Sequence, residues 1–440
     1  MHIVFLTHYF PPEVNAPASR TFEHAQRWVR AGHKVTVIAG PPNHPDGVLY
    51  PGYRNRIRQW EETDGIRVLR VLTYVSANEA FLRRTLNYFS YMISSTLLSF
   101  LVRRVDVVIS TSPQFFCGMA GLWVAGLKRR PWILEIRDLW PESISAVGAI
   151  RNRRVIKALE SLETFLYRRA DHIVSVTRSF KRHIAARGVD PERISVLTNG
   201  VDLSQYHPLR KENGIRTRLN LEGKFIASYL GTHGMAHGLD TVLRAADLLR
   251  GQNNIVFLLV GGGAERNRLL ARRDELGLKN VLMLPQQPKE QMPHFLAASD
   301  ACMVLLKKVD LFKTVIPSKM FEAMAMERPI ILGVEGESKG IIEQGNCGVC
   351  IEPENEHDLA ESVMRLSKNP DAGIQMGLNG GRFVREHFDR DTLAKRYLEL
   401  ITAAADQKTR TGAQCDAVAG VEGRGNRQGK NHSRFSFLFS

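Results

Sequence analysis

The stretch that decides the fold is Thr314–Leu332, TVIPSKMFEAMAMERPIIL. Pro317 ends an extended segment, because its fixed φ and its missing N–H interrupt both a strand ladder and a helix interior. We expect Ser318 to cap a short helix, in which apolar residues then recur at helical spacing. Pro329 closes this helix, and residues 330–332 are typical of a buried strand. The stretch therefore predicts a helix whose amino end points into a cleft.

Lys319 and Glu322 lie in the first turns of this predicted helix. A helix amino end offers free N–H groups and partial positive charge to a phosphate. Glu322 is not part of a capping box, since that motif would place Glu at position 321. Its carboxylate could accept hydrogen bonds from sugar hydroxyls, or it could simply complement the helix dipole. On this segment alone both roles stay open.

Apolar strands alternate with helical segments in the first half of the chain. Predicted strands are 3–8, 35–39, 68–73, 105–111, 132–136, 173–176 and 194–197, and predicted helices are 20–31, 81–103, 115–128, 151–170 and 179–187. This rhythm indicates a parallel sheet with helices on both faces, ending in a domain boundary near residue 200.

The second half repeats the pattern. Predicted strands are 225–230, 255–260, 281–284, 301–306, 329–332 and 348–351. The prediction is an α/β chain of two doubly wound, Rossmann-like domains, 1–200 and 201–380, that face an interdomain cleft. A C-terminal helix, 381–404, is expected to pack back toward the first domain. Residues 405–440 lack periodicity and are predicted to be a disordered tail.

Glycine-rich loops follow two predicted strands of the second domain. Gly231 and Thr232 begin a loop that runs to His237, and Gly261-Gly262 follow the next strand. Glycine at such turns lets a backbone approach a diphosphate closely. Neither loop is a G-x-G-x-x-G fingerprint or a P-loop. Their convergence with the 317–322 helix start predicts a donor site at one sheet edge.

Two polar loops of the first domain are expected to face the same cleft. In the loop after the first strand, Asn15 and Ser19 are candidate acceptor contacts, Ser19 is a candidate N-cap, and Arg20 could meet an anionic acceptor. Arg137 and Asp138 follow the 132–136 strand, with the third candidate catalytic residue close behind, Glu142. An ion pair of purely structural duty between Arg137 and Asp138 is the alternative.

Metal and disulfide chemistry have weak support in the sequence. Asp389-Arg390-Asp391 spells DxD, but it begins the last helix, so helix capping explains it better. No cluster has metal-ligand spacing, and we expect no metal or other cofactor. Cys347 and Cys350 form a lone CxxC that is better explained by strand cysteines. Five cysteines and an apolar start without a signal-peptide pattern favour a cytoplasmic protein.

The net charge of +15 is concentrated in the first domain. Residues 1–200 carry 28 Lys/Arg against 16 Asp/Glu, whereas residues 201–404 carry 26 of each. This asymmetry implies an anionic partner for the first domain, either nucleic acid or the anionic cytoplasmic leaflet. The segment 81–104 is apolar between two Arg-Arg pairs but too short and polar to span a bilayer. It is either a helix that packs partly against lipid or a buried crossover helix.

Several motifs together resemble a known family. YLGTHGMAHGLDTVL, LLVGGGAERNRL, PSKMFEAMA and NGVD, with EIRDLWPES and HYFPPEVNAPASR, are similar to retaining glycosyltransferases of family 4, which have the GT-B architecture. The resemblance covers roughly residues 1–402 and lies nearest the bacterial O-antigen, capsule and colanic-acid branch, which includes N-acetylfucosaminyl transferases. It implies that the second domain binds a nucleotide-sugar and the first binds the acceptor.

The resemblance also assigns roles by position. Glu322 is similar to the second Glu of the family's E-x7-E motif, which hydrogen-bonds the donor ribose, while Thr314 stands where the first would fall. Thr232 and His237 stand where many members place Arg and Lys against the diphosphate. Our hypothesis is that Lys319 supplies part of the missing charge, with His237 as hydrogen-bond donor. Ser318 and the glycines of the two loops are the other expected donor contacts.

The implied reaction is metal-independent transfer with retention from a nucleoside-diphosphate sugar, with UDP and an N-acetylamino sugar favoured. The implied acceptor is a lipid-linked saccharide of a surface polysaccharide, and the basic domain would rest on the inner leaflet of the cytoplasmic membrane. Asp138 and Glu142 are expected to position the acceptor hydroxyl and the donor sugar. The alternatives are a UDP-sugar 2-epimerase, a nucleic-acid-binding protein, which lacks any supporting motif, and an NAD-dependent dehydrogenase, which lacks its fingerprint.

Overall fold

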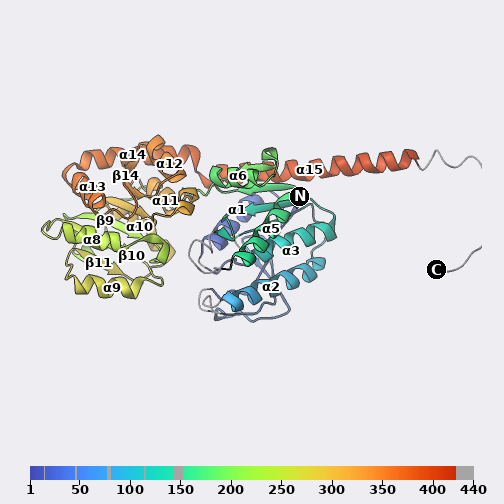
Figure 1. The fold of residues 1–440 in the computed structure, drawn as a ribbon, viewed down its shortest axis with the longest axis horizontal. Helices are drawn as coiled ribbons and strands as arrows, with labels where there is room; N and C mark the ends of the chain where they lie inside the picture. The colour runs from blue at the N-terminus through green and yellow to red at the C-terminus, as the bar shows by residue number, and fades with distance from the viewer. Residues whose placement is uncertain (14, 45–46, 77–80, 113–114, 143–151, 423–440) are drawn as a thin grey trace, which may run out of the picture.

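The computed structural model describes residues 1–422 except 14, 45–46, 77–80, 113–114 and 143–151. Two α/β domains lie side by side, and one long helix runs from the second domain along the first (Figure 1). Each domain is built on its own sheet, of eight and six strands. The predicted fold class is confirmed.

The first sheet has the strand order β3-β4-β2-β1-β5-β6-β7-β8, and every pairing except β3 with β4 is parallel. Its strands are β1 (His2–Leu6), β2 (Lys34–Ala39), β3 (Arg58–Thr63), β4 (Ile66–Val71), β5 (Val107–Thr111), β6 (Trp132–Ile136), β7 (His172–Ser175) and β8 (Ile194–Val196). The central strands are buried on both faces, which explains their continuous apolar runs.

Helices cover both faces of this sheet. They are α1 (Ala16–Arg30), α2 (Phe81–Leu98), α3 (Phe115–Lys128), α5 (Arg153–Arg169) and α6 (Arg178–Ala186), with the short 3-10 turns η1 (Ser99–Leu101) and η2 (Pro191–Arg193). One core lies between the sheet and α2, α3, α5 and α6. The other lies between the sheet, α1 and the C-terminal helix α15 (Arg390–Glu422).

The second sheet is entirely parallel in the order β11-β10-β9-β12-β13-β14. Its strands are β9 (Phe225–Leu230), β10 (Ile255–Val260), β11 (Val281–Leu284), β12 (Ala301–Leu305), β13 (Ile330–Gly333) and β14 (Gly348–Cys350). The strand order reverses beside β9, so the topological switch point lies where the first glycine-rich loop leaves the sheet.

Helices also cover both faces of the second sheet. They are α7 (Gly214–Leu219), α8 (Asp240–Leu248), α9 (Arg266–Glu275), α10 (Met292–Ala298), α11 (Lys319–Ala325), α12 (Glu337–Gly345), α13 (Glu356–Lys368) and α14 (Pro370–His387), with 3-10 turns η3 (Met235–His237), η4 (Lys289–Gln291) and η5 (Asp310–Thr314). Helices α8, α9 and α13 pack on one face, and α7, α10, α11, α12 and α14 pack on the other.

The chain crosses between the domains twice, at neighbouring points. Val201 N donates to Phe388 O (3.0 Å), and Arg390 N donates to Val201 O (3.1 Å), so the outgoing and returning segments are hydrogen-bonded to each other. After the second crossing, α15 packs on α1, where Trp28 Nε1 donates to Ala394 O at 3.1 Å. The C-terminal helix therefore contributes to the core of the first domain.

Three predictions about elements need correction. The predicted C-terminal helix 381–404 consists of parts of two helices, because the chain turns at Phe388 between α14 and α15. Helix α15 continues to Glu422, so the predicted tail is helical over 405–422, where no proline interrupts the sequence. Residues 423–440 lie outside the described part. Strand β3 was not predicted, because its side chains are exposed or half-buried and it carries little apolar signal.

Candidate active site between the two domains

Helix α11 begins at the predicted place but without the predicted cap. The Ser318 side chain makes no capping hydrogen bond, and its backbone is already helical (φ −59°, ψ −29°). The first turn is closed instead by backbone contacts, with Met320 N donating to Pro317 O at 3.1 Å. The carbonyl of Pro317, the last residue of the extended segment, therefore accepts the hydrogen bond that closes the first turn of this seven-residue helix.

The Lys319 ammonium is buried at this point without a hydrogen-bond partner in the described part of the chain. Its Nζ lies 3.9 Å from the centroid of the Tyr229 ring, a cation–π contact. Burial lowers the pKa of Lys319 to about 7, although the nearby Glu322 carboxylate opposes the shift. A buried ammonium that has only an aromatic face beside it is well suited to receive an anion.

The first glycine-rich loop is shaped around this lysine. Gly231 has φ +137°, a conformation that favours glycine, and a Cβ there would lie 2.8 Å from Lys319 Nζ and would displace the ammonium. Thr232 is exposed, and its carbonyl accepts a hydrogen bond from the Tyr229 hydroxyl at 2.9 Å. The His237 ring stacks edge-on to Tyr229 at 5.9 Å. Burial and the charge of Lys319 lower the pKa of His237 to about 4, so the ring is neutral at neutral pH.

The second glycine-rich loop packs directly on the first. A Cβ at Gly261 would lie 1.9 Å from Gly231 O, and one at Gly263 would lie 2.6 Å from His233 O. His233 N donates to Gly262 O at 2.7 Å, which ties the loops together. We expected these glycines to admit a diphosphate. The structure shows that Gly261 and Gly263 are first required for the packing of the loops, whereas a Cβ at Gly262 would meet only the Gln286 side chain at 3.6 Å.

Glu322 lies one turn after Lys319 in a half-buried position. Burial raises the pKa of its carboxyl, while the charges of Lys289 and Lys319 and a hydrogen bond from the Tyr206 hydroxyl oppose the shift. The carboxylate is therefore an acceptor surrounded by donors. Thr314, at the position of the first Glu of the family motif, donates its hydroxyl to Leu311 O at 2.6 Å and closes η5.

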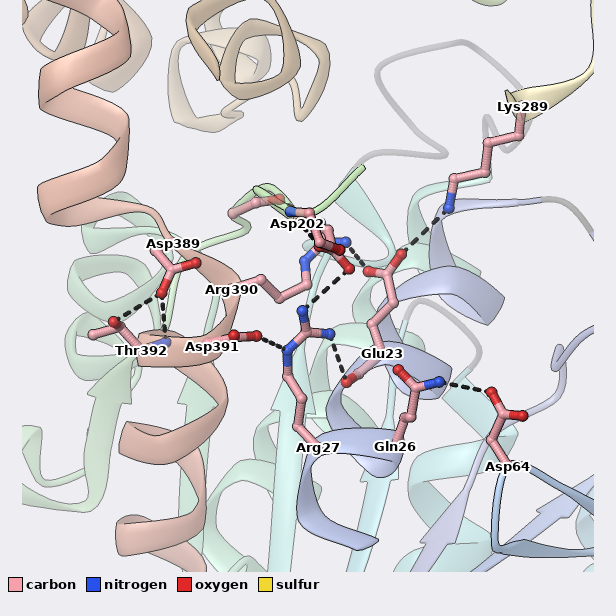
Figure 2. Close-up of polar contacts among 12 residues, drawn as sticks. Glu23, Gln26, Arg27, Asp64, Asp202, Lys289, Asp389, Arg390, Asp391 and Thr392 are labelled. Atoms are coloured by element: carbon pink, nitrogen blue, oxygen red, sulfur yellow. Dashed lines mark hydrogen bonds and ion pairs between the residues drawn. The ribbon is translucent and has the colours of Figure 1, made fainter. Parts of the chain in front are cut away.

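Charged residues link the two domains beside this site (Figure 2). Glu23 of α1 is buried and accepts from Lys289 Nζ of the second domain at 3.3 Å and from the Arg390 guanidinium at the start of α15. Arg27, one turn further along α1, pairs with Asp202 at 3.1 Å and with Asp391. Lys289, which bridges the two domains, thus also lies close enough to Glu322 for its charge to lower the pKa of that carboxyl.

A second contact joins the domains at α6. The carboxylate of Glu337, the first residue of α12, accepts from Arg178 N at 3.0 Å and from Ser179 N at 3.0 Å. This acidic side chain from the second domain therefore caps the amino end of a helix in the first. Together with the Glu23 cluster, it holds the two domains against each other at two separate points.

The structure changes the roles expected for two of the three acceptor-loop residues. Asn15, not Ser19, caps α1: its Oδ1 accepts from Ala18 N at 2.9 Å, and Ser19 lies inside the helix. Arg20 is buried and pairs with Glu135 of β6 at 3.0 Å. Its remaining donors bind the segment 197–199. Arg20 therefore joins α1 to the end of the sheet and is not directed at an anionic acceptor. The Asn15 amide nitrogen is buried and has no partner in the described residues.

The three candidate catalytic residues have different surroundings. Arg137 has a buried Nη1 without a hydrogen-bond partner in the described chain, and burial, only partly offset by Glu135, lowers its pKa to about 10. Asp138 is half-buried at the end of β6. Glu142 is held by His183 Nε2 of α6 at 3.2 Å and by Arg187, the residue that follows α6. Although burial opposes it, these partners lower the pKa of Glu142. Glu142 is thus a structural anchor for α6, in contrast to the role we expected.

Two further candidates at the donor site were not predicted. His233 is fully buried, and neither ring nitrogen has a hydrogen-bond partner among the described residues. Burial lowers its pKa to about 4, so the ring is neutral. Arg266 begins α9 beside the second glycine-rich loop, and its Nε is likewise buried without a partner. Their positions next to the glycine runs were the sequence signal that could have identified them.

The DxD sequence has a structural role. The carboxylate of Asp389 accepts from Thr392 N and from the Thr392 hydroxyl, both at 3.0 Å, so it caps α15 as predicted. Asp391 pairs with Arg27. Among the described residues, no group of three or more His, Cys, Asp or Glu side chains is arranged to hold a metal ion. Within the same residues, no helix is both long and apolar enough to cross a bilayer.

Comparison with known proteins identifies both domains. Residues 15–200 match the family described as Glycosyl transferase 4-like domain, and residues 211–382 match the family described as Glycosyl transferases group 1. WcaI of Escherichia coli strain K12, whose name assigns it to colanic acid biosynthesis, is 26% identical over 365 residues, which are 80% of this chain and 89% of WcaI. The probable glycosyltransferase WbjE of Pseudomonas aeruginosa is 24% identical over 332 residues, 74% of this chain and 79% of WbjE.

A solved structure supports the same architecture. HepE of Anabaena in complex with UDP-glucose aligns with a TM-score of 0.68 at 17% identity and covers 92% of this chain and 100% of HepE. At this identity the likeness establishes the fold, while the family matches establish the enzyme class over the epimerase, dehydrogenase and nucleic-acid-binding alternatives. The chain therefore belongs to the family 4 glycosyltransferases, and its two domains have the GT-B architecture.

Proposed function

We propose that this enzyme transfers a sugar from a UDP donor to a lipid-linked saccharide during synthesis of a bacterial surface polysaccharide. One observation carries the proposal: the buried ammonium of Lys319, which has no hydrogen-bond partner among the described residues, lies beside two interlocked glycine-rich loops and one helical turn before Glu322. A diphosphate at Lys319 would leave the ribose close to Glu322, whose carboxylate can accept hydrogen bonds from its hydroxyls.

The names of similar proteins support the donor and the process. HepE was crystallised with UDP-glucose, which makes UDP the nucleotide to test first. WcaI is named for colanic acid biosynthesis, and by analogy we place this enzyme in the synthesis of a surface polysaccharide. An N-acetylamino sugar remains our proposal for the transferred group.

The proposed reaction forms a bond between the acceptor oxygen and the anomeric carbon of the sugar and breaks the bond from that carbon to the donor phosphate. The acceptor proton passes to the departing phosphate on the same face, so configuration is retained and no enzyme nucleophile is required. Lys319 stabilises the growing negative charge of the UDP leaving group, a role that a metal ion performs in other enzymes. Asp138 and Arg137, at the end of β6, are the residues we assign to acceptor positioning.

The first experiment is calorimetric titration with UDP, GDP, ADP and NAD, each with and without Mg²⁺. We expect metal-independent binding of UDP, weakened about tenfold or more in Glu322→Ala, because a hydrogen bond to a charged group contributes roughly 1.5–3 kcal/mol. An Asp389→Ala variant, which lacks a different carboxylate, should bind as wild type does. Absence of nucleotide binding, or binding that requires Mg²⁺, would refute the proposed donor site.

Donor binding should also take up a proton above neutral pH. Lys319 has a pKa of about 7 in the free protein, so it is charged below that pH and neutral above it. A bound diphosphate favours the charged form and raises this pKa. At roughly one pH unit above the free pKa, binding of UDP-glucose should therefore draw in close to one proton per site. Calorimetry in buffers of different ionisation enthalpy measures this proton uptake. The uptake should vanish in Lys319→Arg. If the wild type takes up no proton, Lys319 does not lie at the diphosphate site.

A further inference from the structure

Helix α2 exposes a stripe of apolar residues to solvent, and on the opposite side it buries several polar residues beside Tyr91 and Met92. The exposed set recurs every three or four residues and continues into η1: Leu86, Phe89, Ile93, Leu97 and Phe100. The buried set on the opposite side includes the polar residues Asn87, Ser95, Thr96 and Ser99. The exposed apolar stripe is unusual for a surface helix of a globular domain, whose apolar residues mainly face the core.

The buried Ser and Thr hydroxyls are satisfied within the helix and η1, whereas Asn87 Oδ1 has no hydrogen-bond partner among the described residues. The Ser95 and Thr96 hydroxyls donate to Met92 O at 3.2 and 2.7 Å, and the Ser99 hydroxyl donates to Thr96 O at 2.7 Å. These small side chains let α2 pack on α3 and the sheet without leaving their buried hydroxyls unsatisfied. The packing of α2 on its own domain therefore leaves the outward apolar stripe uncovered.

Helix α3 extends the same apolar surface. Trp123 and Leu127 are 42% and 52% exposed and lie one helical turn apart. The two helices are joined on this side by an edge-on contact of Phe89 with Phe116 at 5.8 Å, and by Lys128 Nζ, which lies 5.5 Å from the Phe100 ring. We call the exposed apolar residues of α2, η1 and α3 the α2–α3 face. Figure 1 shows α2 on the side of the first domain away from α15.

Positive charge surrounds this face. Between Phe81 and Arg130 the sequence has seven Lys/Arg and one acidic residue, Asp106, whose carboxylate accepts from His2 N at 2.7 Å. At the η1 end, a cavity of about 510 Å³ is lined by four cationic residues, Lys34, Arg67, Arg103 and Arg104, by Leu101 of the face itself, and by Met1, His2 and the single carboxylate of Asp106. An apolar stripe bordered by cations is typical of a helix that lies in the interface of an anionic bilayer.

The charge pattern favours an anionic bilayer over two other possible partners of this face, a second copy of the chain and nucleic acid. A second copy of the chain in a twofold dimer would bring the same cations against each other, because such an interface is self-complementary. Nucleic acid would match the cations but would leave the apolar stripe in water. Phospholipids offer both an acyl region for the stripe and phosphate groups for the cations.

We infer that the α2–α3 face inserts into the interfacial region of an anionic bilayer, with phosphate headgroups bound in the cationic cavity beside η1. This inference deepens the proposed function, since a lipid-linked acceptor would be presented at such a surface. Of the two structures expected for the segment 81–104, it favours the helix that packs partly against lipid over the buried crossover helix. One side of the helix packs on the domain, and the exposed apolar side contacts lipid.

Flotation with vesicles tests the inference. Wild type should bind vesicles of phosphatidylcholine with about 30% phosphatidylglycerol and bind pure phosphatidylcholine far more weakly. The double variant Leu97→Glu/Phe100→Glu should lose at least about tenfold of this binding. The matched control is Ile374→Glu on α14, because Ile374 and Leu97 are similarly exposed, 60% and 62%. Brominated lipids should quench tryptophan fluorescence in wild type much more than in Trp123→Phe.

Each outcome separates this inference from the proposed function. Unchanged vesicle binding by the double variant, or loss of equal size in Ile374→Glu, overturns the α2–α3 face as the docking site. A wild-type dimer that the double variant converts to monomer, without vesicle binding, assigns the face to a second copy and also overturns the inference. UDP binding should be the same in every variant. Vesicle binding by a wild type that fails to bind UDP would support the face and refute the proposed donor.

Discussion

Replacement of Lys319 by alanine is expected to weaken binding of a UDP-sugar about 10- to 100-fold and to leave uridine binding nearly unchanged. The Lys319 ammonium is buried beside the Tyr229 ring and has no hydrogen-bond partner in the described chain, so its charge is available to the diphosphate. A hydrogen bond to a charged group contributes roughly 1.5–3 kcal/mol, which corresponds to that range of affinity. Parallel calorimetric titrations with UDP-glucose and with uridine measure the two losses.

Two matched variants complete this experiment. Lys308→Ala removes an exposed lysine of the same domain that pairs with Glu352, and it should not change either affinity. Lys319→Arg keeps the charge on a longer side chain and should restore part of the UDP-glucose affinity. Equal losses for uridine and UDP-glucose in Lys319→Ala would show that the lysine supports the fold of the site and does not bind the diphosphate.

The largest loss of stability is expected for Glu23→Ala. Glu23 is buried and pairs with Arg390 at the start of α15 and with Lys289 of the second domain (Figure 2). Its removal leaves the half-buried Arg390 guanidinium without its carboxylate, and breaking a buried pair in this way typically costs about 3–5 kcal/mol. Chemical denaturation followed by fluorescence and circular dichroism should show this loss in the unfolding transition of the first domain.

Glu399→Ala is the control for that prediction, because Glu399 is an exposed carboxylate on α15. Surface substitutions of this kind usually change stability by no more than about 0.5 kcal/mol. If Glu23→Ala shifts the transition no further than Glu399→Ala does, the cluster in Figure 2 contributes little to the docking of α15, and the apolar contacts of that helix hold it alone.

The sequence was sufficient to predict most strands because their apolar runs are continuous. Strands β6, β9, β10 and β11 begin and end at the predicted residues, since each is a run of mostly buried apolar residues in a parallel sheet. Strand β3 escaped prediction because RQWEET lies at the sheet edge and buries little. Its pairing with β4 is determined by the hairpin at Asp64-Gly65, where both residues have positive φ.

The site was predictable in its loops but not in its contacts. Glycine runs and the proline-started helix marked the candidate donor site, because such residues have a local conformational signature. The roles of Arg20 and Glu142 depended on partners more than forty residues away, Glu135 and Arg187, and no local pattern indicates such pairs. The buried ring of His233 depends likewise on the packing of the two glycine-rich loops, and the ion pair of Lys289 with Glu23 exists only after the domains are packed.

The crossing of α15 has a consequence for synthesis on the ribosome. The first domain completes its core with Leu393, Tyr397 and Ile401, which are translated after the whole of the second domain. Domains usually fold in the order in which they emerge, from the amino terminus onward. Here the second domain is continuous in sequence and can fold first, while α1 and the sheet beside Trp28 wait with an uncovered apolar surface. A nascent chain arrested before residue 389 should therefore need a chaperone that a chain released after residue 404 does not.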